Sequence, residues 1–246
     1  LLVGSAIGAW LATSVETTEM PQLVGLFNGF GGGASALVAG AELIDQFGST
    51  GTTGTLPYDV TGAAALAGLI GAVTFWGSLV AAGKLQGVLE DPIRYWNEQA
   101  VKLIVSLVAL LAGLYLVVQP GFLGPVPLAD WVPAYWFLIL VASVLGVLVV
   151  VPIGGADMPV VIALLNACSG LAAATTGFVL DNSVLIIAGT LVGASGLILT
   201  TIMCRSMNRS LTDVLFGTFG ESSPMAGDET ADIYEGNIMS TSPEEV

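Results

Sequence analysis

Two asparagines occupy equivalent places in a pair of matching motifs. Asn28 follows Glu-Met-Pro at positions 19–21 and Asn166 follows Asp-Met-Pro at 157–159, in each case seven residues after the proline and four before a glycine. If both segments are helical, each asparagine lies roughly 10 Å beyond its proline. A carboxamide donates and accepts hydrogen bonds but takes up no proton near neutral pH. The pair is therefore suited to orienting water or joining helices, and not to storing a proton.

The composition excludes several other kinds of chemistry. The chain has no His, which excludes zinc sites with imidazole ligands, Ser/His/Asp triads and a histidine proton relay carried by this chain alone. Five Lys and Arg residues against 19 Asp and Glu give a net charge of -14, so no basic surface is available for nucleic acid. Cys168 and Cys204 lie in apolar runs and are interpreted as small apolar residues. We expect no metal site and no catalytic residue in this chain.

The elements that must position the asparagines are membrane-spanning helices. Only 10% of the residues are charged and the mean hydropathy is +0.88, whereas soluble domains carry about 25% charged residues. A bilayer core of about 30 Å needs about 20 apolar residues per helix. Seven apolar runs reach or approach this length: residues 1–13, 21–43, 60–83, 101–118, 132–151, 159–180 and 184–204. The predicted fold class is an all-α membrane protein, a polytopic bundle of about seven helices.

Basic and aromatic residues predict how these runs lie in a cell membrane. Basic residues near helix ends are retained on the cytoplasmic side. If the seven runs cross in turn, one side receives Lys84, Arg94, Lys102, Arg205 and Arg209. We therefore expect a C-terminal tail in the cytoplasm and a location in the inner membrane. Aromatic residues near the run ends are predicted to anchor them at the membrane surface: Tyr95, Trp96, Trp131, Tyr135 and Trp136.

The asparagine motifs belong to a longer repeat. Residues 69–72 (LIGA) resemble residues 191–194 (LVGA), so each asparagine helix and the helix after it form a repeated pair. Both asparagines then lie at the same depth on parallel helices, as in transporters built from parallel repeats. An amide facing lipid costs a few kcal/mol, so both should face the bundle interior. They either join helices or line a hydrated path.

Glycine spacing predicts close packing of the same helices. Small residues four apart on one helix face allow close approach, and two sets show this spacing: Gly25, Gly29 and Gly33, and Gly189 and Gly193. The run "GFGGG" at 29–33 lies inside an apolar segment with no preceding strand, so it is not a dinucleotide-binding fingerprint. We expect the chain alone to bind no nucleotide.

The two ends of the sequence differ in composition. Residues 1–209 are predicted to be a transmembrane domain, incomplete at its N-terminus because the first run is too short to span a bilayer. Residues 219–246 are rich in Glu, Asp, Ser and Thr and cannot bury enough apolar surface to fold alone. We therefore expect residues 210–246 to be a cytoplasmic linker toward a further domain.

Three segments together resemble one protein family. They are "EMPQLVGLFNGFGG" at 19–32, "GGADMPVVIALLNACSG" at 154–170 and "IMCRSMNRSLTDVLFGTFG" at 202–220. They resemble the membrane domain of the beta subunit of proton-translocating NAD(P) transhydrogenases. The resemblance implies nine spans, a linker and an NADP(H)-binding domain, with NAD(H) on a partner alpha subunit and a dimer of the complete complex. It also implies coupling of hydride transfer from NADH to NADP+ to inward proton movement.

The resemblance also assigns roles to residues. Asn166 matches a channel asparagine, and Asn28 stands where some members carry a channel histidine, which implies that a membrane helix of the alpha subunit supplies the histidine instead. The cytoplasmic loop and hinge that face the NADP(H) domain are matched by Asp157, Arg205, Asn208, Arg209 and Asp213. The spacing of residues 205, 209 and 213 further predicts one helix face carrying an ion-paired stalk.

Two other functions are compatible with a helix bundle of this kind. An ion-coupled secondary transporter would bind its substrate between the asparagine helices, but such proteins place a charged or broken-helix site at the midplane. No apolar run here has an acid or base near its centre. A membrane anchor for an enzyme would not need two asparagines at one depth.

Overall fold

A computed structural model describes residues 2–16, 19–50, 58–89, 95–122 and 128–216. Every regular element in these ranges is a helix, which confirms the predicted all-α class: α1 (Leu2–Ser14), α2 (Met20–Thr50), α3 (Tyr58–Leu85), α4 (Glu98–Phe122), α5 (Leu128–Val150), the 3-10 turn η1 (Gly155–Asp157), α6 (Met158–Val179), α7 (Ser183–Ser206) and α8 (Leu211–Phe216). The chain divides into a compact unit Leu1–Leu215, described below, and a second unit Phe216–Val246. Arg94 and residues 217–246 of the predicted linker lie outside the described residues.

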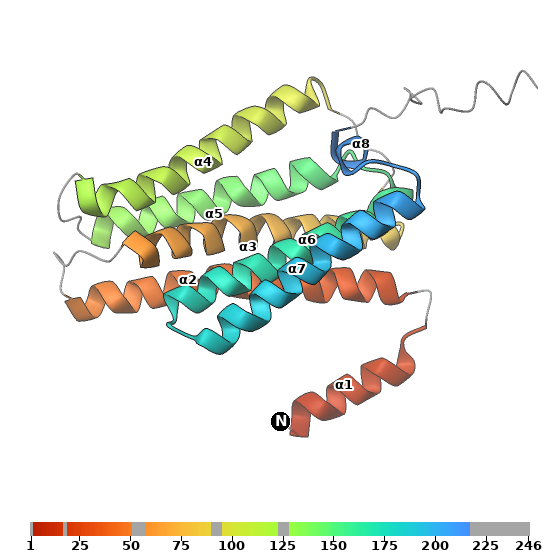
Figure 1. The fold of residues 1–246 in the computed structure, drawn as a ribbon, viewed down its shortest axis with the longest axis horizontal. Helices are drawn as coiled ribbons and strands as arrows, with labels where there is room; N and C mark the ends of the chain where they lie inside the picture. The colour runs from red at the N-terminus through yellow and green to blue at the C-terminus, as the bar shows by residue number, and fades with distance from the viewer. Residues whose placement is uncertain (1, 17–18, 51–57, 90–94, 123–127, 217–246) are drawn as a thin grey trace, which may run out of the picture. The chain divides into compact units, whose positions relative to one another are not determined.

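Six helices, α2 to α7, are long and apolar enough to cross a membrane, and α1 is shorter. This agrees with the seven predicted runs, of which the first is too short. Successive spans run in opposite directions, so α2, α4 and α6 all start at the end of the bundle that holds α8 (Figure 1). Helices α2 and α4 continue beyond the predicted ends of their runs, and Asp45 is therefore helical. A helix keeps its backbone hydrogen bonds as it leaves the apolar layer, so nothing requires it to end there.

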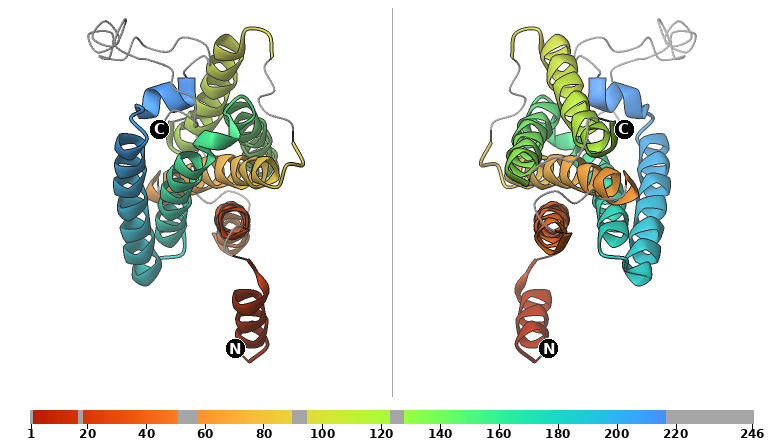
Figure 2. Two further views of the ribbon diagram at one scale, coloured as in Figure 1. Left: turned by 90° about the vertical axis from the view of Figure 1, so that its right-hand side faces the viewer. Right: turned by 90° about the vertical axis from the view of Figure 1, so that its left-hand side faces the viewer.

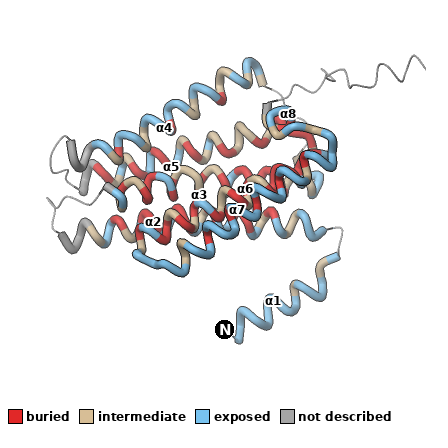
Figure 3. Tube along the Cα trace, viewed as in Figure 1, coloured by how far each residue is buried: buried red, intermediate tan, exposed pale blue. Residues whose placement is uncertain are grey.

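Helices α3 and α6 form the centre of the bundle. Helix α3 packs against α2, α4, α5 and α6, and α6 also packs against α2 and α7. Within the most apolar stretch of each helix, 61% of the stretch is buried inside the bundle in α3 and 56% in α6. The buried share is 17% in α4 and 22% in α7. Figure 3 shows the same contrast, and the end-on views of Figure 2 place α4 and α7 at the margin. The outer helices therefore present many Leu, Ile and Val side chains to the outside of the bundle.

Glycines bring α2 against α3 and α6 against α7 in the same way. A Cβ atom on Gly32 would lie 2.8 Å from the carbonyl oxygen of Gly71. A Cβ atom on Gly170 would lie 2.8 Å from the carbonyl oxygen of Gly189 and would also overlap the backbone of Gly193. Gly32 and Gly170 are equivalent in the two asparagine motifs, and Gly71 and Gly193 are equivalent in the second match. The structure therefore supports the predicted helix-pair repeat, because backbones this close leave no room for a side chain.

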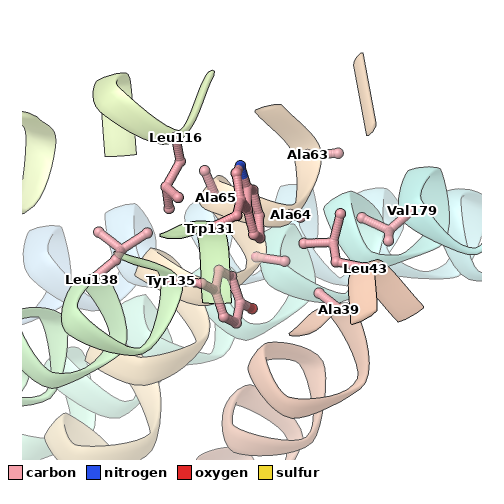
Figure 4. Packing of buried hydrophobic residues seen from close by; sticks show 11 residues of the cluster. Ala39, Leu43, Ala63, Ala64, Ala65, Leu116, Trp131, Tyr135, Leu138 and Val179 are labelled. Atoms are coloured by element: carbon pink, nitrogen blue, oxygen red, sulfur yellow. The ribbon is translucent and has the colours of Figure 1, made fainter. Parts of the chain in front are cut away.

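Two aromatic residues at the start of α5, Trp131 and Tyr135, belong to the core (Figure 4). Trp131 and Tyr135 are 1% and 2% exposed, and their rings stack with centroids 5.7 Å apart. A Cβ atom on Gly40 or Gly68 would lie 2.6 or 2.9 Å from the Tyr135 ring, so these glycines of α2 and α3 form its slot. The Tyr135 hydroxyl donates to the carbonyl oxygen of Ala36 at 2.7 Å. The prediction that both side chains anchor α5 at the membrane surface is wrong. Two aromatic residues predicted as anchors are exposed: Trp96 and Trp136.

Candidate functional site

Asn28 lies in a hydrogen-bonded network that joins α2, α3 and α6. Its side chain is 8% exposed. Its Nδ2 donates to Oγ of Ser78 on α3 at 3.0 Å, and its Oδ1 accepts from Oγ of Ser169 on α6 at 2.5 Å. A buried amide is tolerated in an apolar bundle when both ends are hydrogen-bonded. Sequence reasoning missed both serines, although Ser169 follows Asn166 by three residues and so lies near it on one helix face.

Ser169 connects the two asparagine motifs. Its Oγ lies 2.5 Å from Oδ1 of Asn28 and 2.9 Å from the backbone oxygen of Asn166. A hydroxyl has one hydrogen to donate. Ser169 can therefore turn that hydrogen toward either motif, and its lone pairs can accept from a third group.

Asn166 has a different environment. Its side chain is half-buried, and its carboxamide makes no hydrogen bond to any described residue. The structure thus brings the two asparagines to one region of the bundle, as the repeat predicts, but only Asn28 is a member of the network. A partly accessible amide of this kind can bind water.

Polar contacts continue along α2 and α6, away from the end that holds α8. Oγ1 of Thr176 lies 3.2 Å from the backbone oxygen of Ser35 on α2 and 2.9 Å from that of Ala172 in its own helix, so it can donate its one hydrogen to either. Further along, Nε2 of Gln46 donates to Oε1 of Glu42 at 3.0 Å and to the backbone oxygen of Val179 at 3.3 Å. Asn28, Ser35 and Glu42 are spaced by seven residues, which places them on the same face of α2. The interface of α2 and α6 is therefore polar at several depths.

An ion pair lies at the N-terminal end of α6. The Asp157 carboxylate is 1% exposed, and Nη1 of Arg209 donates to its two oxygens at 2.7 and 2.9 Å. Asp157 directly precedes α6, but its side chain makes no capping hydrogen bond to that helix. A buried carboxylate is stable only when it is paired. The pair therefore holds the loop before α6 to the segment after α7.

The segment after α7 turns sharply before it reaches Arg209. Helix α7 ends three residues earlier, Asn208 has φ 52°, and the N–H groups of Asn208 and Arg209 donate to carbonyl oxygens in the last turn at 3.1 and 3.0 Å. This is a Schellman turn, in which asparagine is one of the few residues that accept a positive φ. The prediction that Arg205, Arg209 and Asp213 share one helix face is wrong, because the turn interrupts the helix. Arg205 and Asn208 are exposed.

Asp213 begins α8. Oγ of Ser210 accepts from the Asp213 N–H at 3.0 Å, and Oδ2 of Asp213 accepts from the Ser210 N–H at 3.3 Å. This reciprocal pair is a capping box. Hydrogen bonds from the Ser210 side chain and backbone, and then the charge of Arg209, hold the pKa of the exposed Asp213 carboxyl below its ordinary value of 3.8.

A comparison with known proteins identifies the family. The family model described as NAD(P) transhydrogenase beta subunit matches residues 1–246. The chain belongs to the NAD(P) transhydrogenase beta subunit family. Two relatives from Rhodospirillum rubrum, one of them from a designated strain, are each named NAD(P) transhydrogenase subunit beta and are 41% identical over 228 residues. The alignment covers 92% of this chain and 47% of each relative, so the chain spans about half the length of these transhydrogenase subunits.

The described part of this transhydrogenase subunit is its multi-pass membrane portion. Nucleotide phosphates bind at glycine-rich turns that follow a β-strand, and the described ranges hold only helices and their connections. The glycines at 29–33 instead serve packing. A Cβ atom on Gly29 would lie 3.2 Å from the backbone oxygen of Phe75, and one on Gly33 would lie 2.9 Å from its ring.

Proposed function

We propose that residues 1–209 form the proton-conducting membrane domain of a proton-translocating transhydrogenase and that residues 210–246 link it to an NADP(H)-binding domain. Hydride transfer from NADH to NADP+ then takes place outside the membrane, with NAD(H) on the alpha subunit, and is coupled to proton translocation through these helices. Membership of the transhydrogenase family favours this function over an ion-coupled secondary transporter and over a membrane anchor.

The observation that carries the proposal is the uncharged network of Asn28, Ser78 and Ser169, with Asn166 beside it. Hydroxyl and amide groups can order water along a path inside a bundle. None of the four binds a proton near neutral pH, and no described acidic or basic side chain hydrogen-bonds to the network. The proton must therefore be held by another group. A histidine on a membrane helix of the alpha subunit suits this role, because its ordinary pKa is about 6.5.

The proposed orientation places the end of the bundle that holds α8 in the cytoplasm. Lys84 and Arg205 lie in the last turns of α3 and α7, and Lys102 lies in the second turn of α4, so all three are at that end. Ala156 is exposed beside the buried Asp157, so a single cysteine at 156 reports on this loop, with Cys168 and Cys204 replaced. In intact cells, an impermeant thiol reagent should leave it unlabelled. Labelling from outside would reverse the orientation.

Asn166→Leu in the complete complex tests the proton path. The variant should fold, while proton translocation and coupled transhydrogenation both fall sharply because the half-buried amide no longer orients water. Hydride transfer between nucleotides bound on the soluble domains should persist. Vesicles reconstituted with all subunits report both quantities.

Thr190→Leu is the matched control. Thr190 is exposed on α7, and its hydroxyl hydrogen-bonds to carbonyl oxygens of its own helix. The substitution should leave proton translocation unchanged. Normal translocation by a stable Asn166→Leu complex would contradict the proposal. So would normal translocation after removal of every membrane histidine of the partner subunit.

A further inference from the structure

Lys84 is a buried cation at the inner end of the bundle. It lies in the last turn of α3 and is 6% exposed. Its Nζ donates to the backbone oxygen of Ile153 at 2.7 Å. Burying an ammonium group is costly unless its hydrogens are hydrogen-bonded. This contact between residues 69 positions apart therefore fixes the connection between α5 and α6 to the end of α3.

The same connection carries the Asp157 carboxylate. Ile153 is 2% exposed and lies four residues before Asp157, and η1, which ends at Asp157, packs against α3 and α6. One side of this short segment is held by Lys84, and its other side is held by the ion pair with Arg209. A change in the position of Lys84 must therefore move the segment that presents Asp157.

Helix α3 joins this end of the bundle to the asparagine network. Ser78, which accepts the hydrogen bond from Asn28, precedes Lys84 by six residues, or about 9 Å along the helix. A helix is stiff over that length because its backbone hydrogen bonds are continuous. A shift of α3 at Ser78 is thus passed on to Lys84.

We propose that Lys84 is a positioning residue that sets the Asp157–Arg209 ion pair according to the position of α3. A shift of α3 at the Asn28 network then moves the segment after α7, because Ser78, Lys84 and the connection at 151–157 link the two. The inference rests on the proposed function for its role in coupling. Its structural content, that Lys84 holds the connection in place, can be tested separately.

Hydrogen exchange of the complete complex tests the structural content. Lys84→Met keeps the length of the side chain but removes its charge and donors, and it should raise exchange about tenfold at 153–158 and 209–213, with α4 unchanged. Lys84→Arg should restore protection. Lys102→Met is the matched control, because Lys102 is also buried at this end, at 8% exposed, and it should leave both segments unchanged. If Lys84→Met does not assemble, Lys84→Gln serves the same comparison.

Proton translocation tests the role in coupling. Lys84→Met should lower it about tenfold, and on an Asp157→Asn background it should add less than about twofold, because both changes act through one ion pair. Unchanged exchange at 153–158, exchange raised throughout the bundle, or independent effects in the double variant would each overturn the inference. Normal translocation by Asn166→Leu would instead overturn the proposed function and leave the exchange result intact.

Discussion

Helices α2 and α6 begin with equivalent motifs but meet different surroundings. Glu19 is exposed, whereas its counterpart Asp157 is 1% exposed and paired with Arg209. Asn28 is hydrogen-bonded to two other helices, whereas Asn166 is half-buried and bonds through its backbone oxygen. Spacing along a helix determines depth in the bundle, and neighbouring elements determine whether a polar group there is paired. The polar positions of the two motifs have therefore diverged.

The glycines of the two motifs have kept one role. Gly32 and Gly170 both lie against the backbone of the following helix. Close approach depends on the two helices of a pair, which are adjacent in sequence, and not on the rest of the bundle. Packing between α2 and α3 thus matches packing between α6 and α7, although the polar positions do not match.

The largest expected loss of stability comes from adding a side chain at the glycines that contact the following helix in both pairs. Gly32→Leu and Gly170→Leu should each cost more than about 3 kcal/mol, because the new side chain meets backbone that cannot move without parting the helices. Gly31→Leu is the control, since a Cβ atom there has nothing within 4 Å. The yield of folded complex and its thermal unfolding in detergent measure the effect. A wild-type melting temperature for either buried variant would break the equivalence of the two pairs.

Substitution of Arg209 should show that Asp157 and its counterpart Glu19 contribute differently to stability. Arg209→Met leaves the buried Asp157 carboxylate without this partner and should lower stability by about 2–3 kcal/mol, less than for a fully buried pair because the Arg209 side chain is 36% exposed. Glu19→Gln, at the equivalent exposed position, should change stability by less than about 0.5 kcal/mol. Both are read from unfolding in detergent. Equal effects would mean that burial does not distinguish these acids.

Substitutions of the two asparagines should lower the stability of the protein by different amounts, although both residues are proposed to serve the proton path. Asn28→Leu removes the hydrogen bonds to Ser78 and Ser169, although Ser169 can still donate to the backbone oxygen of Asn166, and it should cost about 1–3 kcal/mol. Asn166→Leu breaks no side-chain hydrogen bond to a described residue and should cost less than about 1 kcal/mol. Chemical unfolding of the two variants gives the ranking. A larger loss at Asn166 would reverse the comparison.

The smallest effect is expected at Asp213. Its pKa is lowered in the folded protein, so folding favours the ionised carboxylate and the stabilisation is present above the ordinary value of 3.8. It is lost as the pH falls through the lower, folded value. Protection of the amides at 210–216, measured relative to the intrinsic exchange rate at each pH, should therefore fall in acid, and Asp213→Asn should weaken that pH dependence. An identical pH profile in the variant would show that another group controls α8.

The sequence alone determined the all-helical class, the apolar runs that form α2 to α7, and the helix-pair repeat. These properties depend on residues close together in the chain. An apolar run must form a helix to satisfy its backbone in lipid, a proline sets where a helix begins, and a glycine period shows which face can approach a neighbour. For the same reason the family motifs at 19–32 and 154–170 can be recognised from the sequence alone.

Only the tertiary structure decided which polar groups are paired. The contacts of Asn28 join residues 50 and 141 positions apart, and the ion pair joins residues 52 apart. Periodicity says nothing about such partners. The burial of Tyr135 depended on glycines from two other helices, and the position of Arg209 depended on one positive φ at Asn208. Pairing of buried polar groups is set by where helices cross, and that is a property of the whole bundle.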